Sequence, residues 1–188
     1  MVTLDAYRVG TGAFFPISTW FHSFSRRIAR EHVLRISLKE GKMDINAMFD
    51  VLERLIDKSK VAVLANMDAQ ATPRLRWMTP ALIRGRDGFL YALTAPDFAK
   101  TAQLKQHPEV EWMIQGPGLQ EILRVRGKAL LVDNPALKAD VLEALGGRLG
   151  TFWKKNPDPS NMVVLETVIE ECCYSKPMTD ESFTATVR

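Results

Sequence analysis

Apolar and polar positions recur along the chain with two different periods, and the changes of period mark the expected elements. Apolar residues at helical spacing over 45–56 follow the N-cap candidate Asp44, which predicts an amphipathic helix. A second capped helix is predicted from Asn134 to the glycine pair 146–147. A short helix is expected over 97–107, where it stops before a proline.

Between these helices, short β-rich runs separated by turn residues predict six strands. They are expected at 61–65, 74–84, 89–93, 110–114, 122–132 and 162–169. The turn at 85–88 is expected to join the second and third strands into a hairpin. Gly127 predicts a bulge or a close backbone approach in the fifth strand. The order predicts a mostly β (α+β) fold, a six-stranded antiparallel barrel with flanking helices.

The two ends of the chain look unlike the part between them. Residues 1–42 hold seven bases and three acids, whereas the rest holds 18 bases and 19 acids. We therefore divide the chain into an extension (1–42), one barrel domain (43–177) and a polar, frayed tail (178–188). The extension is interpreted as dispensable, with the domain beginning at Met43. The alternatives are a helix at 17–34 that packs on the domain and an organelle transit peptide.

Composition narrows the class of protein further. With 46% hydrophobic and 25% charged residues, the chain is an ordinary globular one. The near-neutral domain lacks the broad basic face of a nucleic-acid binder, and no apolar run reaches the roughly 20 residues that a membrane span needs. Cys172 and Cys173 are adjacent and are expected as free thiols, which favours a cytoplasmic protein. No metal-ligand spacing is found.

The candidate chemistry is a set of cations at strand ends. Arg74 and Arg76 are two residues apart and would share one face of a strand. Thr94 and Lys100 follow the next strand, so the hairpin is expected to bring all four together. Two kinds of cation, a hydroxyl and free helix N–H groups form a phosphate-binding set. The alternative is that these are solvated surface cations.

Several segments, taken in order, resemble the pyridoxamine 5′-phosphate oxidase-like family of FMN-binding split barrels, within it most of all the general stress protein branch. The segments are 73–79 with its Arg-x-Met element, 89–94, 100–104, 107–110, 125–129 and 162–166. The resemblance spans roughly residues 44–177. It implies a homodimer with FMN at the subunit interface. Arg76 and Lys100 would hold the FMN phosphate, with Arg74 as a second cation.

By the same resemblance, the backbone of Trp77, Met78 and Thr79 would run along the isoalloxazine ring, and Thr94 would bond the ribityl or phosphate end. Trp112 and Trp153 are candidates to cover the ring from the partner chain, or else are core residues. No side chain is assigned as catalytic. The function expected is that of an FMN-binding redox protein, a flavin-dependent oxidoreductase that uses a small-molecule electron donor or acceptor.

The sequence also departs from the family pattern. Phe98 stands where many relatives have a Ser, and Ile122 where the true oxidases have a Gln. The segment 172–177 lacks the Arg- and His-containing element with which those oxidases grip their substrate. The departures argue against vitamin B6 oxidation. The alternatives are a deazaflavin or heme ligand, a non-catalytic flavin-binding or stress-related protein, and a plain dimerisation module.

Overall fold

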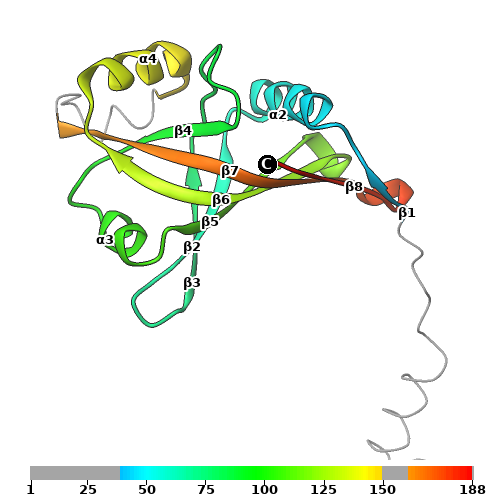
Figure 1. Ribbon diagram of the computed structural model, residues 1–188, viewed down its shortest axis with the longest axis horizontal. Coiled ribbons are helices and arrows are strands. Elements are labelled where there is room, and N and C mark those ends of the chain that lie inside the picture. Colours follow the sequence, from blue (N-terminus) through cyan, green and yellow to red (C-terminus); the bar gives the residue numbers. More distant parts are fainter. Residues whose placement is uncertain (1–38, 150–160, 188) are drawn as a thin grey trace, which may run out of the picture. The chain divides into compact units, whose positions relative to one another are not determined.

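The computed structural model describes residues 39–149 and 161–187 (Figure 1). One sheet holds all the described strands, which are β1 (Lys39–Lys42), β2 (Ala62–Met67), β3 (Pro73–Met78), β4 (Phe89–Thr94), β5 (Glu109–Gln115), β6 (Ile122–Val132), β7 (Val163–Lys176) and β8 (Glu181–Thr186). The helices are α2 (Ile45–Ser59), α3 (Ala99–Gln106) and α4 (Pro135–Leu145), with short 3-10 turns η1 (Pro117–Leu119), η2 (Gly146–Leu149) and η4 (Pro177–Thr179). The mixed α+β class is confirmed.

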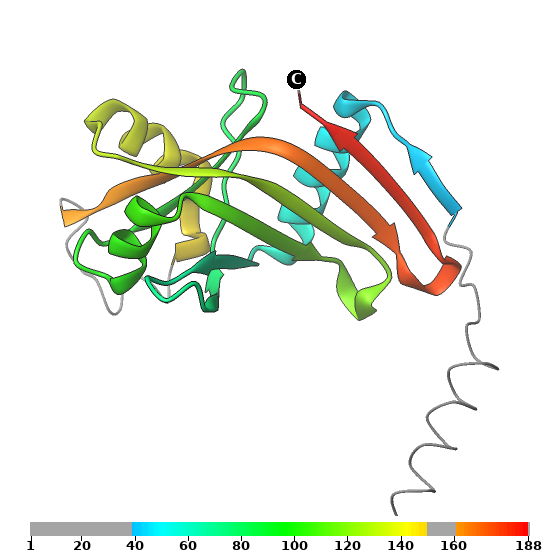
Figure 2. The ribbon, with the colours of Figure 1, turned by 60° about the horizontal axis from the view of Figure 1, so that its bottom comes forward.

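Strand β7 is shared between two parts of the sheet, as Figure 2 shows. One edge pairs with β6 over 164–175, apart from residue 170, whereas the other edge pairs first with β4, over 163–168, and then with β8, over 171–176. The strand order β7-β6-β5-β2-β3 returns to β4 through one bridge, in which Ala81 and Tyr91 exchange two backbone hydrogen bonds of 2.8 and 2.9 Å. Strands β2 to β7 therefore form the expected barrel, and the single bridge between Ala81 and Tyr91 closes it.

A bulge marks the point where β7 changes partner. The register with β6 steps from Arg126–Glu171 to Gly127–Ile169, which leaves Glu170 as an extra residue on β7. A Cβ on Gly127 would lie 2.1 Å from the carbonyl oxygen of Val168, so only glycine allows this approach. The predicted bulge at Gly127 is confirmed.

The predicted caps begin the two longer helices. Asp44 accepts hydrogen bonds from two backbone N–H groups of α2, and Asn134 does the same for α4. Phe98 offers α3 no such acceptor, and α3 begins only at Ala99. α2 packs on β5, β6 and β8, α4 on β4 and β7, and α3 on β2 and β6. The last placement matters for the site, because it sets α3 beside β2 and β3.

Strand β4 is buried on both faces. Leu90 and Ala92 belong to the main core inside the barrel, which α2 also covers. Tyr91 and Leu93 point the other way, into a second core that α4 covers with one side of its helix. The continuous apolar run Phe89–Thr94 therefore reflects two cores rather than one half-exposed strand.

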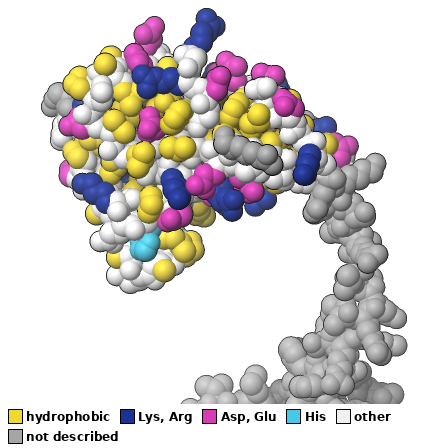
Figure 3. All heavy atoms as spheres, viewed as in Figure 1, with side chains coloured by type: hydrophobic (Ala, Val, Ile, Leu, Met, Phe, Trp, Pro, Cys, Tyr) yellow, Lys and Arg dark blue, Asp and Glu magenta, His cyan; other side chains and the backbone are white. Residues whose placement is uncertain are grey.

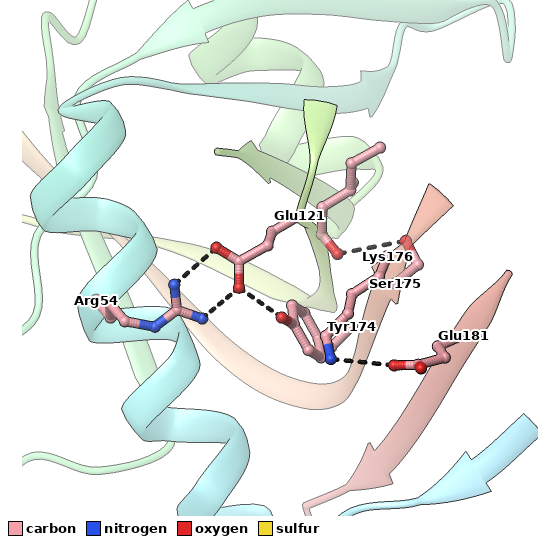
Figure 4. Close-up of polar contacts among 7 residues, drawn as sticks. Arg54, Glu121, Tyr174, Ser175, Lys176 and Glu181 are labelled. Atoms are coloured by element: carbon pink, nitrogen blue, oxygen red, sulfur yellow. Dashed lines mark hydrogen bonds and ion pairs between the residues drawn. The ribbon is translucent and has the colours of Figure 1, made fainter. Parts of the chain in front are cut away.

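A polar cluster links Arg54 of α2 to Glu121, directly before β6, and to Tyr174 of β7 (Figure 4). Glu121 accepts two hydrogen bonds from Arg54, of 2.7 and 2.8 Å, and a third from the hydroxyl of Tyr174. These donors, Arg54 first, lower the pKa of Glu121 to about 2. The side chains of this cluster are hydrogen-bond partners of one another. The sequence did not mark any of them for chemistry.

The structure corrects the expected number of strands, the frayed tail and the hairpin. The described residues form eight strands, not six, because β1 lies in the range assigned to the extension and β8 in the tail expected to fray. The hairpin of the second and third strands is wrong: β3 pairs with β2, and Pro80 separates it from the single bridge at Ala81. The alternative helix at 17–34 lies outside the described residues, and the division at residue 42 stays a prediction.

We expect Gly127→Ala to destabilise the protein by about 3 kcal/mol or more, because the backbone of Val168 cannot move out of the way of the new methyl group. Gly147→Ala is the matched control, since a Cβ at Gly147 meets no atom within 4 Å. Urea unfolding of the two variants measures the difference. Equal stabilities would show that the sheet does not depend on the close approach at Gly127.

Candidate functional site

The residues predicted to bind a cofactor lie on β3 and on elements beside it. They are Arg74, Arg76, Trp77 and Met78 on β3, Thr79 directly after it, Thr94 at the end of β4, and Lys100 in the first turn of α3. Side chains alternate along a strand, so Arg74 and Arg76 share one face of β3 and Trp77 lies on the other. The strand thus has a cationic face and an apolar face.

Arg76 and Lys100 are close enough for their charges to interact, and Lys100 is buried while Arg76 is half-buried. Lys100 is 8% exposed, and burial together with the charge of Arg76 lowers the pKa of its ammonium to about 8. Burial is also the first cause of the lowered pKa of Arg76. Among the described residues, neither side chain has a carboxylate within ion-pair distance. A buried cation beside a half-buried one, without a counter-ion among the described residues, favours an anionic ligand.

The contacts of Lys100 and Arg76 also leave their positive charges without a counter-ion. Its ammonium lies 4.4 Å from the centre of the Phe98 ring, in a cation–π contact. The ring stabilises the positive charge but cannot neutralise it. The Arg76 Nε is buried and has no hydrogen-bond partner in the structure. The pair therefore keeps both its charge and a free donor.

Arg74 has a different partner. Its guanidinium bonds Asp68 from Nε at 2.8 Å and from Nη2 at 2.7 Å. Asp68 also accepts from the backbone N–H groups of Thr72 and Gln70, and the bond from Thr72 is the first cause of its lowered pKa. The charge of Arg74 is thus already compensated inside the turn between β2 and β3.

The remaining predicted residues differ in how much of them a ligand can reach. Met78 belongs to the main core and Thr94 is fully buried, with its hydroxyl 3.4 Å from the carbonyl oxygen of Ala95. Thr79 is half-buried. Trp112 is fully buried and donates from Nε1 to the Thr167 hydroxyl at 3.1 Å, so it is a core residue. Trp153 lies outside the described residues.

The apolar face of β3 is exposed. Leu75 is 71% exposed and Trp77 is 67% exposed. Val61, directly before β2, and Leu119 of η1 are also exposed. Trp77 borders a hollow of about 290 Å³ between the start of β2 and η1. An edge strand with large exposed apolar side chains is typical of a surface that another chain covers.

Two residues that the sequence did not single out complete the cation site. The Gln103 Oε1 accepts from the Arg76 Nη2 and from the Asn66 Nδ2, each at 3.1 Å. Gln103 lies three residues after Lys100, on the same side of α3, which is the only signal in the sequence that connects it to the site. Asn66 is placed there by tertiary structure alone.

Other kinds of site find less support in the part of the chain that the structure describes. No group of three or more His, Cys, Asp or Glu side chains is arranged to hold a metal ion. Over residues 39–149 and 161–187, no helix has the length and hydropathy of a membrane span. On the face in Figure 3, basic and acidic side chains are interspersed. Cys172 and Cys173 are free thiols, as predicted.

Fold and site together define a split barrel with a buried lysine and a half-buried arginine beside one strand, neither of them compensated by a carboxylate of the described residues. A family model described as pyridoxamine 5′-phosphate oxidase matches residues 48–176, more than half of the sequence, and the chain therefore belongs to this family of split-barrel proteins. A comparison with curated proteins finds no match.

Solved structures with the same fold have different described roles. A Clostridium acetobutylicum protein related to general stress protein 26 of B. subtilis has a TM-score of 0.59 at 16% identity, over 77% of this chain and 97% of that one. A NimC/NimA family protein of the same organism has a TM-score of 0.56 at 20% identity, over 74% and 94%. A heme-binding protein of Mycobacterium smegmatis has 0.54 at 15%, over 70% and 55%. At these identities the likeness is one of fold.

We expect Lys100→Met to stabilise the cofactor-free protein at pH 7, by up to about 3 kcal/mol. Folding lowers the pKa of Lys100 from 10.5 to about 8, so the unfolded chain binds the extra proton between these values. The stability advantage of Lys100→Met over the native protein should therefore shrink as the pH rises from about 8 to 10.5, whereas groups that both proteins share, such as Cys172, affect both alike.

Denaturant unfolding at pH 6 to 10.5 checks the prediction, with Lys105→Met, at an exposed lysine of the same helix, as the control. A Lys100→Met protein that is less stable than the native protein below pH 8 would contradict it.

Proposed function

We propose that this protein binds FMN and is a flavin-dependent redox protein, not a true pyridoxamine phosphate oxidase. The observation that carries the proposal is the pair of buried Lys100 and half-buried Arg76, neither of which has a carboxylate partner in the described structure. A phosphate dianion would compensate both charges and accept from the free Arg76 Nε. The residues present therefore fit the phosphate end of FMN.

The other assigned residues have supporting parts in this proposal. The backbone of Trp77, Met78 and Thr79 would lie along the isoalloxazine ring, and Thr94 would meet the ribityl or phosphate end. Arg74 would act as a second, longer-range cation, because Asp68 already holds its guanidinium. When bound, FMN supplies hydride and electron transfer, and the protein supplies anchoring and exclusion of water. No side chain of the site needs to act as an acid or base.

The distinction from the true oxidases rests on the end of the chain. The segment that would carry a substrate-gripping element is the second half of β7 here, and β8 after it contains neither Arg nor His. The cysteines are both free, which agrees with a reducing compartment, and we keep the cytoplasm as the proposed location.

The visible spectrum of the purified protein tests the proposal, followed by titration of the cofactor-free protein with FMN and with riboflavin, which lacks the phosphate. Arg76→Ala and Lys100→Ala should each weaken FMN binding roughly 10- to 100-fold and change riboflavin binding little, because they remove phosphate contacts. Arg84→Ala is the control, since Arg84 is exposed and lies outside the cation site.

A colourless protein that ignores added FMN would overturn the proposal, and so would FMN affinities that both variants leave unchanged. A heme or deazaflavin spectrum would favour the alternative ligands. A bound flavin that NAD(P)H never reduces would favour a non-catalytic flavin-binding protein.

The same proposal includes a homodimer, with the apolar face of β3 as its contact. Leu75→Glu should then give a monomer and weaken FMN binding, because the charge would lie inside the contact and the partner would no longer cover the flavin. Sedimentation velocity measures the effect, with Met178→Glu, at an equally exposed residue of η4, as the control. A monomeric native protein, or a dimer that Leu75→Glu leaves intact, would refute this contact.

A further inference from the structure

The orientation of two amide groups in the cation site follows from the chemistry of their partners. The guanidinium of Arg76 can only donate, so Gln103 must turn its oxygen toward the Arg76 Nη2, at 3.1 Å. That oxygen then needs a donor from Asn66, whose Nδ2 lies 3.1 Å away and also donates to the Met67 carbonyl at 2.8 Å. The three side chains form one chain of hydrogen bonds with a single possible direction.

This chain leaves specific groups free for a ligand. Asn66 is 3% exposed, and its Oδ1 is buried without a partner in the structure. The Arg76 Nε is in the same state. Unsatisfied buried polar groups are rare in proteins and cost free energy. An anion can complete the Arg76 Nε, which is a donor, whereas the Asn66 Oδ1 is an acceptor and needs a donor from another group.

The two arginines on this face of β3 are held in chemically opposite ways. Asp68, a carboxylate, holds Arg74 at 2.7 Å and cancels its charge. Gln103, a neutral amide of nearly the same shape as glutamate, holds Arg76 and leaves its charge in place. A glutamate at 103 would satisfy the same hydrogen bond and would compensate Arg76 from within the protein, as Asp68 does for Arg74.

We propose that Gln103 is the positioning residue of the anion site, which fixes the guanidinium of Arg76 while leaving its positive charge for the phosphate. The proposal rests on the proposed function for the identity of the anion as FMN. It deepens that function by assigning the selectivity for a negatively charged ligand to a neutral side chain that contacts Arg76.

The test compares Gln103→Glu with Gln106→Glu in the full-length protein. Gln106 is exposed on the same helix, so both variants change the net charge equally. Gln103→Glu should weaken FMN binding roughly 10- to 100-fold at pH 8, with riboflavin binding little changed. The loss should persist down to pH 5, because the cations beside it hold the pKa of the new carboxyl below its ordinary value. Gln106→Glu should stay close to the native protein throughout.

A second measurement does not depend on flavin. In the cofactor-free protein, Gln103→Glu should raise the pKa of Lys100 from about 8 toward its ordinary value, because a carboxylate joins the cation pair, and NMR titration of the lysine signals measures it. If the native protein binds no FMN but this rise is seen, the proposed function fails and the role of Gln103 stands. If the native protein binds FMN and Gln103→Glu binds it equally at every pH, the role of Gln103 is refuted and the function stands.

Discussion

The pairing of β6 with β7 carries the architecture, because the bulge within it sets where the barrel ends. Gly127 lets β6 approach the Val168 carbonyl, and Glu170 is the residue left over. The β4 ladder stops at Val168 and the β8 ladder begins at Glu171, on either side of that residue. The first half of β7 thus pairs with β4 in the barrel, and its second half pairs with β8, beside which β1 lies. The bulge bends the strand between the two halves.

The same strand arrangement explains how the two cations, Arg76 and Lys100, come to lie together. The barrel sets β2 between β5 and β3, and α3, which leads into β5, packs back on β2. Lys100 and Gln103 on one side of α3 therefore face Asn66 and Arg76. Bringing a buried lysine beside a half-buried arginine opposes folding, and the main core and the hydrogen-bonded Glu121 cluster elsewhere in the fold offset that cost.

The fold alone does not identify a ligand. Structures with similar TM-scores include a heme-binding protein and a relative of a general stress protein. A function has to be argued from the side chains that a common fold carries. In this chain the proposal rests on the cations Arg76 and Lys100, the ring of Phe98 over Lys100, and the neutral amide of Gln103.

By itself the sequence determined what depends on neighbouring residues: α2 and α4 with their caps, the limits of β6, the bulge at Gly127, and Arg76 and Lys100 as a related pair. Tertiary structure decided what depends on distant partners. The second half of β7 and all of β8 look polar, and they form strands because β7 also pairs with β6 and β8 also pairs with β1. Likewise, Asp68 compensates Arg74 while Gln103 leaves Arg76 charged, since long-range strand and helix packing selects each partner.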